Sequence, residues 1–224
     1  MVHILLEGYN LSEPWLFDSL CAYIKPFHKV AVLPFAFRDS RVRSAENWDF
    51  LYSKENGKYY GGITGGFLPY GIPEENITFV QYYRDTPTSA AEKIKNADIV
   101  YFPGGLPDRM MERIREFALE DVLMKYPGIV IGYSAGAVLQ LAEYHLSPDE
   151  DYPTFGYYKG LPYLRDFYLE VHYTGTDEQK ESIRRVLTER KKTVYATHLG
   201  SGAVLVDSGT VKLLGKVHVF EAEK

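Results

Sequence analysis

The sequence is poor in the features that mark several large classes of protein. It holds one cysteine, Cys21, in 224 residues, so no internal disulfide and no cysteine cluster for a metal can form. No apolar run approaches the length of about 18 residues that a membrane-spanning helix needs. Lysine and arginine number 25 against 30 aspartates and glutamates, a net charge of −5, whereas nucleic acid favours a basic partner. We therefore expect neither a membrane nor a nucleic-acid partner.

The beginning of the chain also lacks the basic segment and apolar core of a signal peptide. Together with the single cysteine, this predicts a reduced, cytoplasmic setting. At about 150 residues per domain, the length corresponds to one large domain or two small ones. The chain contains no linker, repeat or low-complexity tract, so we expect a single domain over residues 1–224. The oligomeric state, a homodimer included, stays open.

Short apolar runs alternate with stretches of helical periodicity along most of the chain. Such alternation predicts an α/β fold of three layers, with a mostly parallel central sheet covered by helices on both faces. A turn at 207–210 between short apolar runs predicts an antiparallel meander at one sheet edge. We expect an irregular loop or flap over 52–73 and irregular structure over 148–164. Strands are predicted at 2–6, 30–34, 77–80, 98–102, 128–132, 168–172 and in four runs between 193 and 220, and helices at 14–23, 40–51, 88–97 (capped by Thr88 or Ser89), 108–125, from 135 and at 177–191.

One motif predicts nucleophilic chemistry. Gly132-Tyr133-Ser134-Ala135-Gly136 matches G-x-S-x-G directly after an apolar strand and before a helix pattern, the context of a nucleophile elbow. The N–H of Ala135, at the helix start, would then point to a developing oxyanion. Pro103-Gly104-Gly105 closes the preceding strand, and the N–H groups of its two glycines can supply a second oxyanion donor. The alternative for both segments is an ordinary strand-to-helix turn.

A nucleophilic serine needs a base, which is usually histidine. Of the six histidines, His172 is the best candidate because it ends an apolar strand. His198 also follows a strand and is the main rival, whereas His145 lies past the elbow helix. For the acid that orients the base, the sequence offers the loop cluster Asp149-Glu150-Asp151. Glu170, two residues before His172, is a second candidate.

These residues resemble the peptidase E and cyanophycinase family of serine hydrolases, which has a class I glutamine amidotransferase-like, flavodoxin-like fold. The resemblance spans most of the chain. It rests on the Ser134 motif, on Phe102-Pro-Gly-Gly105 and on Val171-His-Tyr-Thr174 followed by Arg184-Arg185. The end of the chain, Ala203-Val-Leu-Val-Asp207 and Lys216-Val-His-Val-Phe220, looks like the family's closing strands.

The resemblance implies a serine-type, dipeptidase E-like peptidase that acts on small peptides with an N-terminal aspartate, without a metal or organic cofactor. It implies Ser134 as nucleophile, His172 as base, Asp149 as acid, and Gly105 and Ala135 as oxyanion donors. The glutamate that cyanophycinases carry in a later segment is missing from residues 197–202. Gly104 and Tyr133 are expected to contact substrate, and Arg109, with Arg84 or Arg184 as alternatives, to bind the aspartyl carboxylate.

Two other functions remain open at this stage. An α/β-hydrolase esterase shares the serine elbow and would use a late base, His198 or His218. A non-enzymatic, amidotransferase-like binding domain would share the fold but would lack a carboxylate that reaches His172. Strand order around the elbow and the partner of His172 distinguish these alternatives.

Overall fold

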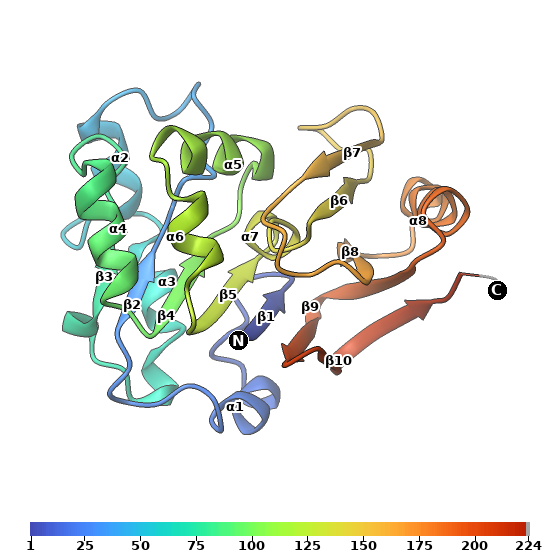
Figure 1. Ribbon diagram of the computed structural model, residues 1–224, viewed down its shortest axis with the longest axis horizontal. Coiled ribbons are helices and arrows are strands. Elements are labelled where there is room, and N and C mark those ends of the chain that lie inside the picture. Colours follow the sequence, from blue (N-terminus) through green and yellow to red (C-terminus); the bar gives the residue numbers. More distant parts are fainter. Residues whose placement is uncertain (223–224) are drawn as a thin grey trace.

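The computed structural model describes residues 1–222, and an eight-stranded sheet runs through the middle of it (Figure 1). Five strands run parallel in the order β1-β5-β4-β2-β3. Their apolar side chains match the predicted runs closely. These strands are β1 (Val2–Leu6), β2 (Val30–Val32), β3 (Ile77–Phe79), β4 (Ile99–Phe102) and β5 (Ile129–Tyr133).

The other edge of the sheet carries the predicted antiparallel strands. The long strand β9 (Thr193–Asp207) runs antiparallel to β1 and to the edge strand β10 (Thr210–Phe220). The second half of β9 pairs with β1, and its first half pairs in parallel with β8 (Phe167–Tyr173). Because β9 reaches beyond the carboxyl end of β1, it holds β8 close to the edge where the parallel strands end.

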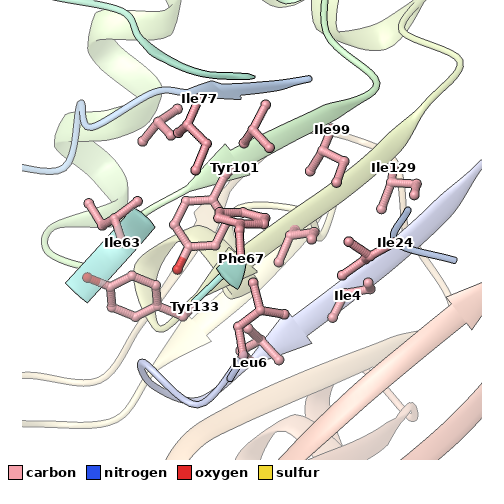
Figure 2. Close-up of a cluster of buried hydrophobic side chains, with 14 of the residues drawn as sticks. Ile4, Leu6, Ile24, Ile63, Phe67, Ile77, Ile99, Tyr101, Ile129 and Tyr133 are labelled. Atoms are coloured by element: carbon pink, nitrogen blue, oxygen red, sulfur yellow. The ribbon is translucent and has the colours of Figure 1, made fainter. Parts of the chain in front are cut away.

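Helices cover both faces of the sheet, as predicted. Alternate strand residues point to opposite faces, so Ile4 and Leu6 enter one core while Leu5 enters another. Figure 2 shows the first core, where Phe67 and Ile63 pack against Tyr101. One face is covered by α1 (Pro14–Leu20), α2 (Ala45–Tyr52) and α3 (Tyr60–Gly65), and the other by α4 (Pro87–Lys95), α5 (Pro107–Glu116) and α6 (Glu120–Met124).

Segment 52–73 was predicted as an irregular flap, and that prediction is wrong. It contains α3 and a 3-10 turn at Leu68–Tyr70. Ile63, Phe67 and Tyr70 from this segment are buried in the core, so its glycine and tyrosine content concealed a packed element rather than a mobile loop.

Other differences concern the ends of elements. The predicted helix 108–125 is two helices, α5 and α6, because Ala118 between them adopts a φ of 50°. The helix predicted over 40–51 begins only after Ser44, and α4 is capped by Thr86 instead of Thr88 or Ser89.

The region after the elbow also holds more structure than predicted. After the short helix α7 (Ala135–Val138), strand β6 (Glu143–Leu146) pairs antiparallel with β7 (Gly156–Lys159). Part of the segment 148–164 is therefore regular. Helix α8 (Asp177–Glu189) packs on β8 and β9. Among the described residues, no helix has both the length and the apolar character needed to cross a membrane.

Candidate active site

Ser134 stands at a sharp turn between β5 and α7. Its backbone has φ 52° and ψ −116°, a conformation that non-glycine residues rarely adopt and that is typical of a nucleophile elbow. A side chain at position 132 would collide with the carbonyl of Gly136, and one at Gly136 would collide with the carbonyl of Phe102. The two glycines of the motif therefore allow the turn to pack tightly against the neighbouring strand.

A chain of hydrogen bonds starts at Ser134. Its Oγ lies 2.8 Å from Nε2 of His172, and Nδ1 of His172 lies 3.0 Å from Oε2 of Glu7. The other oxygen of Glu7 accepts a 2.7 Å hydrogen bond from the N–H of Gly200. Because the Glu7 carboxylate accepts a hydrogen bond from Nδ1–H, the lone pair of Nε2 faces the serine hydroxyl. This arrangement can draw a proton from Ser134.

Strand pairing brings the three side chains together. Glu7 follows β1 and Ser134 follows β5, and the N–H of Ser134 donates to the carbonyl of Leu6 at 2.9 Å. His172 comes from β8, where the pairing register shifts between Glu170 and Tyr173 and His172 itself has a φ of 53°. This irregularity directs the imidazole to the ends of β1 and β5.

The predicted acid Asp149 has other partners. Its Oδ1 accepts hydrogen bonds from the N–H groups of Asp151 (2.8 Å) and Tyr152 (2.7 Å), which close a tight turn. Asp151 is paired with Arg38. Within residues 1–222, the cluster 149–151 makes no hydrogen bond to His172. The structure thus brings Ser134 and His172 together but leaves Asp149 apart from them.

Glu170, the second predicted acid, belongs to a separate buried group. Its carboxylate accepts a 2.7 Å hydrogen bond from Nε2 of His145 and hydrogen bonds from the hydroxyl of Ser147. Two residues apart on a regular strand, Glu170 and His172 would lie on the same face, but the register shift of β8 interrupts this alternation. Sequence reasoning missed Glu7, whose only signal is its position directly after an apolar strand that neighbours the elbow strand.

The rival histidines also lie elsewhere. The rings of His198 and His218 contact each other at a tilt of 42°, with centroids 4.6 Å apart, beside Tyr173. In the described chain, neither histidine is hydrogen-bonded to Ser134. The strand arrangement and these positions do not support the esterase alternative.

The backbone N–H groups that were predicted to bind the oxyanion belong to Gly105, which lines the same cavity as Ser134, and to Ala135, the residue after Ser134. Neither N–H group has an acceptor within residues 1–222. Gly105 has a φ of 136°, and a side chain there would collide with the carbonyl of Ala36, so glycine is needed for this turn. Both N–H groups are free to bind an oxyanion.

A cavity of about 330 Å³ opens beside Ser134 and His172, and we refer to it as the serine cavity. Within the described part of the chain, its charged lining consists of Arg38 and Arg41, and no carboxylate lines it. Arg41 is exposed and forms no ion pair within the described residues, whereas its companion Arg38 is held by Asp151, which raises the pKa of the Arg38 guanidinium. The remaining lining residues are Gly8, Tyr9, Ala36, Phe37, Leu51, Tyr52, Tyr59, Pro103, Gly104, Gly105 and Tyr133.

The predicted substrate contacts divide into two groups. Gly104 and Tyr133 line the serine cavity, and the Tyr133 ring packs at a tilt of 45° against that of Tyr9, with centroids 4.3 Å apart. Burial raises the pKa of Tyr133, so its hydroxyl stays neutral. Arg109 does not line the cavity, and its guanidinium forms an ion pair with the Glu112 carboxylate at 2.7 Å.

The alternative cations lie outside the serine cavity as well. Arg84 pairs with Asp49, and Arg184 pairs with Glu181 on α8. The arginines that do line the cavity come from the loop after β2, which the sequence did not single out. In the part of the chain that the structure describes, no group of three or more His, Cys, Asp or Glu side chains could hold a metal ion.

Comparison with known proteins fits this geometry. Residues 55–214 match the model of peptidase family S51. The chain belongs to peptidase family S51. Members of this family are serine-type peptidases, so the chain is a serine-type peptidase. Ser134 and His172 lie inside the matched region, while Glu7 precedes it.

Solved structures with the same fold have distant sequences. The "Putative Peptidase E Protein" of Listeria monocytogenes EGD-e is 16% identical, with a TM-score of 0.64, over 96% of this chain and 98% of that one. A peptidase from an acI-B1 Actinobacterium is 15% identical, with a TM-score of 0.66, over 99% and 91% of the two chains. No curated protein sequence matches this chain.

Proposed function

We propose that this S51 peptidase cleaves the peptide bond after an N-terminal aspartyl residue of small peptides, with Ser134, His172 and Glu7 as its catalytic residues. The observation that carries the proposal is the unbroken series from Ser134 Oγ to His172 and on to the buried carboxylate of Glu7. A binding domain without activity would have no need of this series, and it would have no reason to keep Ser134 in a strained conformation.

The reaction follows from the positions of the groups. Ser134 Oγ attacks the carbonyl carbon while Nε2 of His172 takes the hydroxyl proton. The N–H groups of Gly105 and Ala135 bind the resulting oxyanion. His172 then gives the proton to the leaving amine, the C–N bond breaks, and an acyl-enzyme remains. Water activated by the same histidine hydrolyses this ester and restores Ser134.

Glu7 orients His172 and stabilises the imidazolium that forms in each half of the reaction. Its side chain is only 4% exposed, whereas that of His172 is 44% exposed. The carboxylate is therefore shielded from water, and the imidazole is accessible to substrate. In the serine cavity, the unpaired guanidinium of Arg41 is the best candidate to bind the aspartyl carboxylate, with Arg38 beside it.

The test is release of free aspartate from a panel of Asp-X dipeptides by the wild-type chain and by Ser134→Ala. We expect the variant to lose at least about ten-thousand-fold in kcat. Ser12→Ala, at an exposed serine in a turn, is the matched control and should match wild type. Cleavage of Asp-X dipeptides by Ser134→Ala would contradict the proposal, as would a wild-type chain that cleaves none of them.

A further inference from the structure

A second cavity lies on the other side of His172. It has a volume of about 260 Å³ and is bounded by α7, β6, β8, the loop 147–149 and the start of α8. Ligand sites for larger molecules are usually above about 300 Å³, so this cavity has room for a single side chain. Among residues 1–222, only His172 lines both this cavity and the serine cavity.

The two cavities carry charges of opposite sign. Of the residues that the structure describes, two arginines and no carboxylate line the serine cavity, whereas Asp149 and Glu170 and no lysine or arginine line the second cavity. Asp149 is held in place by the hydrogen bonds that its Oδ1 accepts from two backbone N–H groups. Its Oδ2 accepts no hydrogen bond within residues 1–222 and is free for a ligand.

His145, a buried residue in the wall of the second cavity, adds a hydrogen-bond acceptor that has no partner within residues 1–222. The His145 side chain is fully buried and lines the second cavity, and its Nδ1 has no hydrogen-bond partner in the described part of the chain. In the neutral tautomer whose Nε2–H donates a hydrogen bond to the Glu170 carboxylate, Nδ1 carries a lone pair. The unused polar atoms of Asp149 and His145 are therefore both acceptors, which suit a donor with positive charge.

The proposed catalytic role of His172 indicates which part of a substrate lies nearest to the second cavity. His172 passes its proton to the leaving amine, so the residue that carries this amine must lie against the imidazole. The side chain of that residue is then the group best placed to enter the second cavity. We propose that this cavity binds the positively charged side chain, lysine or arginine, of the residue that the peptidase releases. The proposal rests on the proposed function of Ser134 and His172.

Turnover of paired dipeptides tests the proposal. We would measure kcat/KM for Asp-Lys and Asp-norleucine, which differ mainly in the side-chain ammonium. The wild-type chain should prefer Asp-Lys about tenfold, the size expected of one charged hydrogen bond. Asp149→Asn should abolish this preference, and Glu150→Gln should keep it, since Glu150 is exposed and does not line the cavity.

Equal kcat/KM for the two dipeptides in the wild-type chain would overturn the proposal. An equal loss for both dipeptides in Asp149→Asn would also overturn it, because the cavity would then bind a group common to both, such as the N-terminal ammonium.

Calorimetry separates this proposal from the proposed function. Lysinamide and norleucinamide mimic the released residue, and their binding to the wild-type chain needs no turnover. Tighter binding of lysinamide that Asp149→Asn removes would support the cation site even if no dipeptide were cleaved. Equal binding of the two amides would contradict it even if the peptidase activity were established.

Discussion

Strand β8 contributes one residue to each of two histidine–glutamate pairs, and only one of these pairs is suited to catalysis. Nδ1 of His172 is 3.0 Å from Glu7, and Nε2 of His145 is 2.7 Å from Glu170. Both glutamates are buried. The pairs differ at the second ring nitrogen, which contacts Ser134 in His172 and has no partner in His145.

The difference teaches that a short contact between histidine and carboxylate does not identify a catalytic base. His172 is half-exposed, beside a cavity and a strained serine, whereas the His145 side chain is enclosed. Even the hydroxyl in the second pair, that of Ser147, donates to Glu170 instead of facing the imidazole. The second pair therefore holds β6, β8 and the following loop together.

Of the substitutions that test the difference between the two pairs, Glu7→Gln is expected to have the largest effect on kcat. The amide keeps the volume of the side chain but favours the wrong tautomer of His172, so kcat should fall by about a thousandfold to ten-thousandfold. The measurement is kcat for a cleaved Asp-X dipeptide, with circular dichroism as a check that the fold is kept. A fall of less than tenfold would mean that Glu7 does not orient the base.

Glu170→Gln should act on stability more than on chemistry. His145 and Ser147 would lose a charged acceptor inside the protein, and we expect the free energy of unfolding to fall by about 3 kcal/mol. Urea unfolding followed by fluorescence measures this change. The loss of kcat should be far smaller than that in Glu7→Gln, and a loss of equal size would show that the two pairs are not functionally distinct.

The smallest of these effects concerns the serine cavity. Arg41→Gln should lower kcat/KM for an Asp-X dipeptide about tenfold, because a carboxylate would lose one charged partner. The same variant should treat Asn-X dipeptides as the wild-type chain does. Arg43→Gln is the matched control, since Arg43 lies two residues away and does not line the cavity. Equal losses of kcat/KM for Asp-X and Asn-X would show that Arg41 does not bind the charged side chain of the substrate.

Much of the fold could be predicted from local patterns. Continuous apolar runs such as those of β4 and β5 predicted a parallel sheet buried on both faces, because strands of that kind have no solvent-exposed side. The elbow could be predicted because only glycine fits at Gly132 and Gly136. Elements rich in glycine and tyrosine, such as α3 and β7, could not, because their composition is that of a loop.

The proposed acid and the two cavities depend on contacts between distant parts of the chain. Glu7 meets His172 across 165 residues, and nothing in the local sequence distinguishes it from other carboxylates that follow strands. The approach of His172 depends on the length of β9 and on the register shift of β8, neither of which has a local signal. The family resemblance implied Asp149 as the acid, and the fold places Asp149 at the second cavity instead.

The most direct test of the central claim is the rate at which a fluorophosphonate labels the wild-type chain and Glu7→Gln, with the adduct located by peptide mass spectrometry. The reagent requires an activated serine and no knowledge of the substrate. We expect one adduct, on Ser134, which forms at least about a hundredfold more slowly in Glu7→Gln because the base is no longer oriented. Labelling of another residue, or equal rates in the two proteins, would contradict the account.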